Sequence, residues 1–508
     1  MTSTSTDVLV VGAGPTGLLL AGDLAVAGVP TTILERRDTE SNLSRAFAVH
    51  ARTLELLDAR GLADELVGMG QKITEAQVFG QTGIHLGRLP SRFPFLLVTP
   101  QYNVEHLLKR RALAAGARLV PAAEMVSLRQ DADGVEASVQ SGQTYQARYL
   151  VGTDGVHSTV RTALGLPFPG RSAVRSVMLA DVKLTETPPD TLTAFASKNG
   201  FSFIAPFNDG WYRVLAWNKR NQLPDDAPVY LAEVAAVTKE AHGTDYGMHE
   251  PRFLSRFHSD ERQVPRYRVG RVFLAGDAAH VHSPAGGLGM NTGLQDAANL
   301  SWKLAAAVQG WAPDELLDTY HSERHPVGRA VLRSSGMLLR FGLVGLASTL
   351  PRRLARVILG AAIGRVPAIN SQVALQVSAI SVRYPAPRGS DQLTGRRVPD
   401  LALAGPAERL YRALGEGKFV LLGPADSTVA DRWADRVVSA VPMRAPRPYI
   451  LVRPDGYVAW AGDDEAKLTE ALHQWCGGLA RAPSGTHARP PGASPAGRYG
   501  ASIPYGSR

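Results

Sequence analysis

Apolar runs that end in glycine and lead into helical spacing recur along the chain. DVLVVGAG (7–14) has the continuous apolar character of a buried strand, and TGLLLAGDLAVAG (16–28) follows with helical spacing that ends at Gly28. RYLVGTDGVHSTVRTAL (148–164) repeats the pattern, and VFLAGDAAHVHSPAGGLGMNTGLQD (272–296) shows it a third time. Buried strands followed by helices predict a parallel sheet in an α/β domain.

The segment 176–269 has a different texture. SVMLADVKL (176–184), GFSFIAPF (200–207) and WYRVLAW (211–217) are β-rich runs separated by polar turns such as NDG (208–210). This pattern predicts an antiparallel sheet that is inserted between the second and third strand-turn-helix segments.

The pattern changes again after about residue 390. GKFVLLG (417–423) and YILVRPDGYVAWAG (449–462) are predicted strands, and Pro-Asp-Gly in the second run indicates a hairpin turn. DEAKLTEALHQWCG (464–477) is predicted to form an amphipathic helix, and the Pro-, Gly-, Ser- and Arg-rich residues 481–508 a disordered tail.

Length and composition limit the possible functions. The 508 residues are too many for one hydrophobic core, so we expect two or three domains. The net charge of +9 comes from Arg spread along the chain without blocks, which argues against a nucleic-acid groove, although a basic surface would help to capture an anionic nicotinamide dinucleotide.

The same data bear on the cellular location. No apolar run reaches the roughly 18 residues that span a bilayer, and FGLVGLASTL (341–350) is expected to be a helix packed on the protein, so no membrane partner is expected. MTSTST at the N-terminus does not resemble a signal peptide, and a single cysteine, Cys476, suits the cytoplasm.

The first glycine turn carries a nucleotide-binding pattern. Residues 12–17 read G-A-G-P-T-G between a strand and a helix, and Glu35 ends the next strand, TTILER (31–36). The glycines allow a tight turn and a close approach of backbone to a pyrophosphate at the helix N-terminus, and the carboxylate accepts hydrogen bonds from a ribose. The segment therefore predicts a dinucleotide site, which suits NAD(P) as well as FAD.

The later turns resolve this choice by resemblance. Gly152-Thr153-Asp154-Gly155 with its following H-S-T-V-R, and Gly276-Asp277 with its glycine loop, resemble the group A flavoprotein aromatic hydroxylases, the para-hydroxybenzoate hydroxylase-like FAD monooxygenases. The likeness covers about residues 5–480 and is closest to bacterial aromatic polyketide hydroxylases with a C-terminal thioredoxin-like domain.

The resemblance implies an α/β fold (α+β overall). It consists of a Rossmann-type FAD-binding domain, an inserted antiparallel β-sheet substrate domain and a C-terminal thioredoxin-like domain. The expected boundaries are 1–175 and 270–390 for the two parts of the FAD-binding domain, 176–269 for the substrate domain, 391–480 for the thioredoxin-like domain and 481–508 for the tail. PADSTVADRW (424–433) lacks the C-x-x-C of an active thioredoxin, so this domain is expected to be redox-inactive.

The resemblance also implies a set of residues that bind FAD non-covalently. Arg45 is expected near the pyrophosphate and the flavin edge, Gln101 at the ribityl chain, Met125 by the adenine, and Asp277 as acceptor for a ribityl hydroxyl; Asp154 belongs to a motif used for both flavin and nicotinamide nucleotide. The full set is Gly12, Gly14, Pro15, Thr16, Gly17, Glu35, Arg36, Arg45, Gln101, Met125, Asp154, Asp277, Pro284, Gly287, Gly289, Met290 and Asn291.

Residues 284–291 match the family's P-x-x-G-x-G-x-N loop, while Ser283 and Leu288 depart from the proline and glutamine of many relatives. Glycines let backbone N–H groups approach a flat ring, and a helix that starts near Asn291 would direct its positive end at the pyrimidine side of the flavin. Since the dipole contributes about 0.3–2 kcal/mol, it would change the flavin potential by tens of millivolts at most.

In the implied reaction NAD(P)H reduces FAD, O2 adds at C4a, and the C4a-hydroperoxyflavin hydroxylates a polycyclic aromatic, polyketide-type substrate in secondary-metabolite tailoring. Phe203, Phe207, Arg213 and Pro284 are the candidate substrate-pocket residues. Arg213 would pair with a phenolate; a role in ordinary sheet core for the aromatic residues, and a solvated surface position for Arg213, remain as alternatives.

Two other functions remain open. The same flavin chemistry could serve Baeyer–Villiger oxidation or epoxidation, or the chain could be a non-catalytic flavin-binding partner protein. No metal site is predicted, because His280 and His282 lack Cys or carboxylate partners nearby in sequence and suit a structural role. NADPH and NADH are not distinguished, and the chain is expected to be a monomer or a homodimer.

Overall fold

The computed structural model describes residues 3–39, 46–78, 82–188, 192–283, 286–313, 315–339, 365–444 and 447–478. Its central sheet has eight strands, and the main path runs β17-β18-β11-β1-β2-β8. The pairs from β18 to β8 are parallel, as the buried apolar runs predicted. The strands are β1 (Ser3–Val11), β2 (Thr31–Leu34), β8 (Arg118–Val120), β9 (Met125–Gln130), β10 (Val135–Val139), β11 (Thr144–Gly152), β17 (Arg268–Val269) and β18 (Val272–Leu274).

Helices cover this sheet and lead away from its strand ends. Helix α1 packs on β1 and β2 and contacts both α4 and α7, and α7 in turn contacts α8. The helices of this part are α1 (Pro15–Val26), α2 (Ala51–Asp58), α3 (Ala63–Gly68), α4 (Gln101–Ala114), α5 (Thr159–Ala163), α7 (Leu288–Gln309), α8 (Thr319–Leu339) and α10 (Pro367–Val377). Two small sheets flank them, with strands β3 (Ala48–Val49), β4 (Gln71–Ile73), β5 (Glu75–Val78), β6 (Thr82–His85) and β7 (Leu96–Val98).

The predicted antiparallel sheet is confirmed and has six strands in the order β13-β14-β15-β12-β16-β19. Two long strands, β12 (Gly170–Lys183) and β16 (His249–Gln263), connect it to the central domain, so the sheet begins a few residues before the expected boundary at 176. The remaining strands are β13 (Thr193–Ala196), β14 (Gly200–Pro206), β15 (Tyr212–Asn218) and β19 (His280–Val281).

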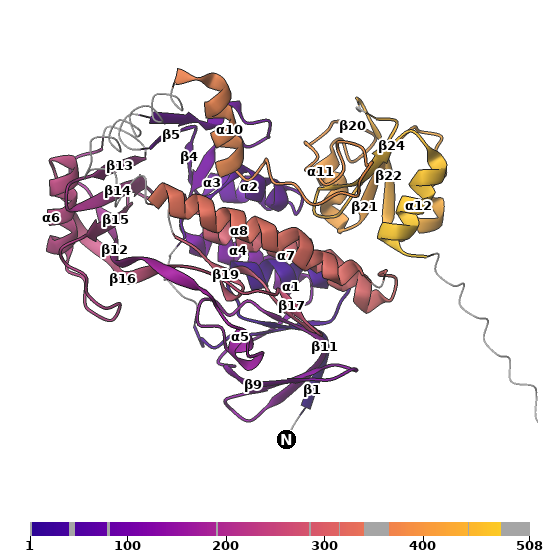
Figure 1. The fold of residues 1–508 in the computed structure, drawn as a ribbon, viewed down its shortest axis with the longest axis horizontal. Coiled ribbons are helices and arrows are strands. Elements are labelled where there is room, and N and C mark those ends of the chain that lie inside the picture. Colours follow the sequence, from indigo (N-terminus) through magenta and orange to yellow (C-terminus); the bar gives the residue numbers. More distant parts are fainter. Residues whose placement is uncertain are drawn as a thin grey trace, which may run out of the picture.

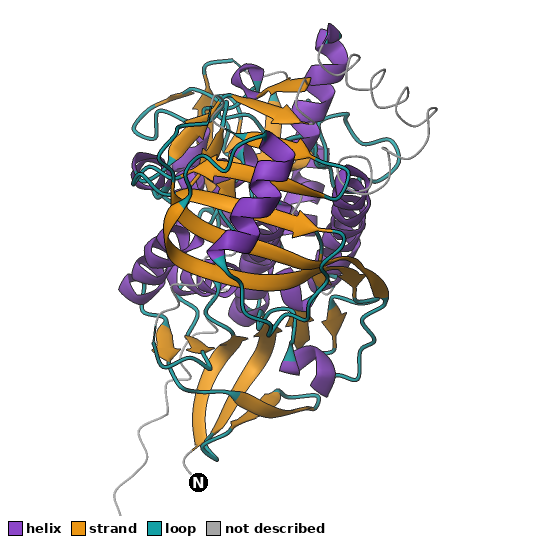
Figure 2. Ribbon diagram, turned by 90° about the vertical axis from the view of Figure 1, so that its left-hand side faces the viewer, coloured by secondary structure: helices purple, strands orange, loops and turns teal. Residues whose placement is uncertain are grey.

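The two faces of this sheet have different partners. Helix α6 (Leu231–His242), which was not predicted, lies across the outer face (Figure 2). On the inner face, Phe201, Phe207 and other apolar residues pack against Phe47 and Ala48 of the central domain. The alternation of strand residues thus places one apolar set under α6 and another towards the central domain.

The C-terminal region forms a mixed five-stranded sheet in the order β20-β22-β21-β23-β24. Its elements are β20 (Leu403–Ala404), α11 (Leu410–Ala413), β21 (Phe419–Leu422), β22 (Val437–Pro442), β23 (Tyr449–Val452), β24 (Val458–Gly462) and α12 (Glu465–Cys476). The predicted Pro-Asp-Gly hairpin and closing helix are both confirmed, and Asp464 caps the helix by accepting the N–H groups of Ala466 and Lys467. A thioredoxin-like fold for this sheet stays a prediction.

The six-stranded sheet and the C-terminal sheet lie at opposite ends of the molecule, with α7 and α8 between them (Figure 1). The segments 341–350 and 481–508, expected to be a packed helix and a disordered tail, lie outside the described residues. Of the helices that the structure describes, none combines the length and the apolar character needed to cross a membrane.

Candidate functional site

The three glycine turns of the sequence meet at one edge of the central sheet. Strands β18, β11 and β1 are neighbours and parallel, so their carboxyl ends lie side by side, with Gly152 in register with both Val11 and Leu274. The Thr153 hydroxyl donates to the carbonyl oxygens of Val11 and Gly12, each at 2.9 Å. Ligands of open α/β sheets bind at this kind of edge.

The first turn is built for close backbone contact. Gly12 has φ +105°, and a Cβ there would lie 2.6 Å from the Thr153 carbonyl oxygen; a Cβ on Gly17 would lie 2.1 Å from the Gly12 carbonyl oxygen. Gly14, the N-cap of α1, has no heavy atom within 4 Å of its Cβ position. The first and third glycines therefore close the turn on the protein, whereas the second faces open space before the helix N-terminus, where a pyrophosphate would lie.

The third turn packs directly on the first. A Cβ on Gly276, which has φ +60°, would lie 2.7 Å from Thr16 Oγ1, and a Cβ on Gly293 only 2.3 Å from the same atom. Arg161, from the second turn, donates to the Ala278 carbonyl oxygen at 3.1 Å. The three turns thus form one site, and the glycine-rich third segment is not a separate nucleotide site.

Glu35 lies where a ribose-binding carboxylate is expected. Its side chain accepts the Ala13 N–H at 2.7 Å and the Arg37 side-chain Nε–H at 2.9 Å. Burial raises the pKa of Glu35, but the hydrogen bonds from Arg37 and Ala13 outweigh this and lower it overall, so the group is a carboxylate. Arg36 is exposed, and Arg37 is the neighbour that pairs with Glu35.

A hollow opens beside Glu35, and several of its residues had no signal in the sequence motifs. Its lining comprises Ala13, Leu18, Glu35, Arg37, Asp38, Thr39, Tyr102, Glu105, His106, Lys109, Leu119 and Pro121. Four of these lie on α4 at the i, i+3, i+4, i+7 spacing of one helix face. That spacing is readable in the sequence once α4 is known to border the site.

Gln101, Met125 and Asp154 are all held by the protein itself. Gln101 accepts the Ala46 N–H at 3.0 Å and donates to Glu105 at 2.8 Å. Met125 is 3% exposed and belongs to the main core rather than to the lining of the hollow.

Asp154 caps the turn before α5. It accepts the Ser158 hydroxyl at 2.5 Å and the Val160 N–H at 3.1 Å, and burial raises its pKa despite these bonds. Arg45 lies outside the described residues.

Asp277 differs from these residues because it is exposed. It lies on a short 3-10 turn (Gly276–Ala278) whose other two residues are buried. A carboxylate exposed at the meeting point of the three turns suits a ligand that offers hydroxyl donors, such as the ribityl chain of FAD.

The glycine loop is held by Asn291 in the first turn of α7, which begins at Leu288, close to the expected start. Asn291 Nδ2 donates to the carbonyl oxygens of Ala48 and Gly287, and its Oδ1 accepts the His50 N–H at 2.9 Å. The His50 ring bonds the Gly286 carbonyl oxygen through Nε2 at 2.8 Å. The loop is therefore tied to the strand and helix at 48–58; Pro284 lies outside the described residues.

His280, next to this loop, has a structural partner. His280 Nε2 lies 2.6 Å from Asp296 Oδ2, and Arg324 Nε donates to Asp296 Oδ1 at 2.7 Å. The Gly276 N–H also bonds Asp296, so this buried carboxylate supports the third turn from behind. The structural role expected for His280 is consistent with these contacts.

The six-stranded sheet presents aromatic residues towards the central domain. The Phe203 and Phe47 rings lie 5.5 Å apart, and Phe207 is buried in the same apolar cluster. Arg213 is fully buried, and it donates to both oxygens of Asp181 at 2.8 Å. A solvated position for Arg213, one of the two alternatives, is therefore wrong, and a substrate phenolate would have to compete with Asp181.

Comparison with known proteins agrees with this site. Residues 5–335 match the family model described as FAD binding domain, and residues 391–478 match the model described as aromatic-ring hydroxylase, C-terminal. The rifampicin monooxygenase of Streptomyces venezuelae is 40% identical over 477 residues, which are 93% of this chain and 98% of that protein. The dialkyldecalin synthase of Streptomyces rugosporus is 36% identical over 483 residues, 93% of this chain and 99% of that protein.

Among solved structures, OxyS anhydrotetracycline hydroxylase from Streptomyces rimosus superposes with a TM-score of 0.82 and 38% identity, covering 94% of this chain and 100% of that one. The family models and the relatives span both the glycine turns and the C-terminal sheet. The chain therefore belongs to the FAD-dependent aromatic-ring hydroxylases, a family of flavoprotein monooxygenases.

Proposed function

We propose that this protein is an FAD-dependent monooxygenase that uses NAD(P)H and O2 to hydroxylate a polycyclic aromatic, polyketide-type molecule during antibiotic tailoring. The observation that carries the proposal is the meeting of three glycine turns, together with an aromatic sheet face that packs on Phe47 and Ala48 next to the glycine loop. The rifampicin and anhydrotetracycline enzymes, named for polycyclic substrates, support the substrate class.

The chain's own residues fit FAD. Gly14 leaves room for a pyrophosphate at the start of α1, because Gly12 and Gly17 close the turn on the protein. Glu35 would bind the adenosine ribose, and Asp277 the ribityl chain. Arg45, Gln101 and Asp154 join them by resemblance. So do the residues expected around the ring: Pro284, Gly287, Gly289, Met290 and Asn291. Bound FAD supplies the redox chemistry, taking a hydride from NAD(P)H and activating O2.

The protein's part in the reaction is to position the substrate and to exclude water. The aromatic side chains Phe203 and Phe207, on the inner face of the six-stranded sheet, suit a flat polycyclic ring system. Excluding water from such a site would limit side reactions of the reactive intermediates. Because Asp181 already holds Arg213, we propose that Arg213 shapes this wall and interacts with a phenolate only beside that carboxylate.

The test is substrate-dependent NAD(P)H oxidation by the FAD-loaded protein. An aromatic polyketide should accelerate NAD(P)H consumption and gain one hydroxyl group, detected by mass spectrometry. A lactone or epoxide product would instead support Baeyer–Villiger oxidation or epoxidation. A purified protein that shows no flavin absorbance after FAD is added would contradict the proposal.

A second candidate function follows from the dialkyldecalin synthase, since that relative is not named for an oxidation. In this function the FAD site would shape a pocket for a ring-forming reaction without turnover of the flavin. The two candidates differ in oxygen dependence, because ring formation without redox change proceeds under anaerobic conditions without NAD(P)H.

We further propose a cytoplasmic location, because the one cysteine, Cys476, is buried and suits a reducing compartment. We also propose that the enzyme is a monomer or a homodimer.

A further inference from the structure

The hairpin turn between β23 and β24 is buried although it is charged. Arg453 and Asp455 are each 2% exposed, and the whole segment from 453 to 456 is buried. Hairpin turns normally lie at the surface, and burying charges costs free energy unless partners compensate them. The partners of this turn are therefore informative.

Asp455 contacts two helices of the FAD-binding domain. Its carbonyl oxygen accepts a hydrogen bond from Arg52 Nη2 of α2 at 2.6 Å, and its Oδ2 accepts one from Asn299 Nδ2 of α7 at 3.2 Å. The approach is close at Gly456, where a Cβ would lie 3.2 Å from Arg52 Nη2. The Arg52 guanidinium also lies over the Tyr457 ring, 5.0 Å from its centroid.

Both helices begin at the flavin loop, the segment Gly286–Asn291. Helix α2 follows His50, which bonds Asn291 and Gly286, and α7 starts at Leu288 within the loop. Arg52 is two residues from His50, and Asn299 is eight residues, about 12 Å along the helix, from Asn291. The hairpin turn thus holds both helices within a few turns of their starts.

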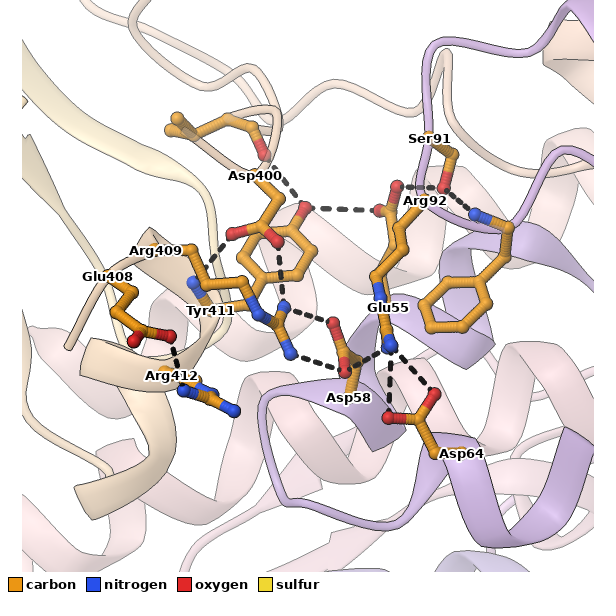
Figure 3. A network of polar contacts seen from close by, with 12 residues as sticks. Glu55, Asp58, Asp64, Ser91, Arg92, Asp400, Glu408, Arg409, Tyr411 and Arg412 are labelled. Atoms are coloured by element: carbon orange, nitrogen blue, oxygen red, sulfur yellow. Dashed lines mark hydrogen bonds and ion pairs between the residues drawn. The ribbon is translucent and has the colours of Figure 1, made fainter. Parts of the chain in front are cut away.

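Additional ion pairs fix the hairpin turn and the rest of its domain. Arg453 donates to Glu323 of α8 at 2.6 and 2.9 Å, and Glu323 also binds Lys303 of α7 at 2.8 Å. Farther along α2, Arg409 reaches Asp58 and Tyr411 reaches Glu55 (Figure 3). The contacts of Arg409 and Tyr411 attach the C-terminal domain to α2. The hairpin turn is the part of that domain that contacts α2 and α7 near their N-termini.

We propose that residues 453–456 of the C-terminal domain position the flavin loop, acting through Arg52 on α2 and Asn299 on α7. The C-terminal domain then contributes to FAD binding and flavin potential without touching the cofactor. This role rests on the FAD site of the proposed function, and it gives a function to a domain that lacks the C-x-x-C motif.

The test compares two arginine substitutions at the same interface. Arg52→Met removes the bonds to Asp455, Tyr411 and Glu55, while Glu55 keeps its pairing with Arg397. Arg409→Met is the matched control, since Arg409 of the C-terminal domain pairs with Asp58 at the other end of α2, and Asp58 keeps Arg92. Each variant loses contacts between the same two domains: Arg52→Met loses hydrogen bonds to the Asp455 carbonyl oxygen and to Tyr411, and Arg409→Met loses the ion pair with Asp58.

We expect Arg52→Met to raise the FAD Kd about tenfold and to shift the flavin midpoint potential, measured by fluorescence titration and by equilibration with a reference dye. Arg409→Met should leave the Kd within about twofold and the potential unchanged. Wild-type FAD binding is measured first, which separates failure of the cofactor site from failure of the positioning role.

An Arg52→Met variant with wild-type Kd and potential would overturn the proposal, as would equal changes in both variants in proportion to lost thermal stability. If Arg52→Met does not fold, Asp455→Asn replaces it. This variant keeps the carbonyl contact to Arg52 but weakens the turn's bonds to Arg453 and Asn299. It should raise the Kd about threefold, and an unchanged Kd and potential would contradict the proposal.

Discussion

Gly14 separates cofactor binding from folding at the scale of a single residue. Its φ of −75° suits any residue, and its Cβ position has no protein atom within 4 Å. We therefore predict that Gly14→Ala leaves the melting temperature of the apoprotein unchanged but raises the FAD Kd at least tenfold, or by about 1.4 kcal/mol. Gly12→Ala, with its positive φ and close carbonyl, should lower both stability and affinity. Unaltered FAD affinity in Gly14→Ala would place the pyrophosphate elsewhere.

His50 makes the flavin loop sensitive to acid. Burial lowers the pKa of His50 to about 4, from an ordinary value of 6.5. Between these values the unfolded chain binds the proton more readily, so stability is complete above pH 6.5 and decreases as the pH falls towards 4. For this one group the loss amounts to about 3 kcal/mol.

His50→Gln keeps an N–H donor for the Gly286 carbonyl oxygen and removes the titration. We predict that urea unfolding between pH 4 and 7 shows a smaller loss of stability for His50→Gln than for the wild-type chain. Some acid sensitivity should persist, because burial also lowers the pKa of His282 to about 4. Identical pH profiles for the two proteins would contradict this role for His50.

Among the secondary-structure elements, β15 and β12 of the six-stranded sheet are joined by the ion pair between Arg213 and Asp181. Among the described residues, removing Arg213 leaves the buried Asp181 with only Arg252, whose Nε is 3.9 Å away, so Arg213→Met should destabilise the protein by about 3 kcal/mol. The double variant Arg213→Met with Asp181→Leu should recover much of this loss in urea unfolding. A single variant as stable as the wild type would show that the pair is not important for the sheet.

The same double variant tests the phenolate role. If Arg213 only shapes the wall, substrate-stimulated NAD(P)H oxidation should be reduced modestly and independently of the substrate's ionisation. A loss confined to the pH range in which the substrate is a phenolate would assign Arg213 a direct contact.

The sequence predicted those elements whose signal is local. Buried strands, glycine turns and the Pro-Asp-Gly hairpin depend on adjacent residues, and all three kinds were confirmed. The lengths of β12 and β16 were not predicted, because these strands bridge two sheets and are half-exposed along part of their course. Helix α6 was missed although it is as long as α1 and α12, because it lies within a segment whose other runs are β-rich.

The candidate site shows the same division. Gly12, Glu35 and Asn291 could be identified from motifs. Arg37, just after β2, and Lys109, on α4, line the hollow together only because α4 packs on α1 in the folded chain. Arg213 was predicted as a substrate-pocket residue, and this role stays a prediction. Its pairing with Asp181 depends on the register of β12 with β15, which a single sequence does not reveal.

At the scale of the whole molecule, the C-terminal domain and the FAD-binding domain share buried ion pairs. Arg397 with Glu55 and Arg453 with Glu323 both cross between them with side chains at most 6% exposed. Screening by salt is weak for such buried pairs. We predict one calorimetric unfolding transition for both domains, with a midpoint that changes little between low and moderate salt. Two separate transitions would show that the domains fold independently.

In the proposed function, bound flavin serves to insert one oxygen atom of O2 into a polycyclic aromatic substrate. The most direct measurement is a turnover under ¹⁸O2 with FAD, NAD(P)H and an aromatic polyketide, followed by mass spectrometry of the product. We predict one ¹⁸O atom in a new hydroxyl group and none from labelled water. A product that forms equally well without O2, or that carries no label, would contradict the proposed monooxygenase function.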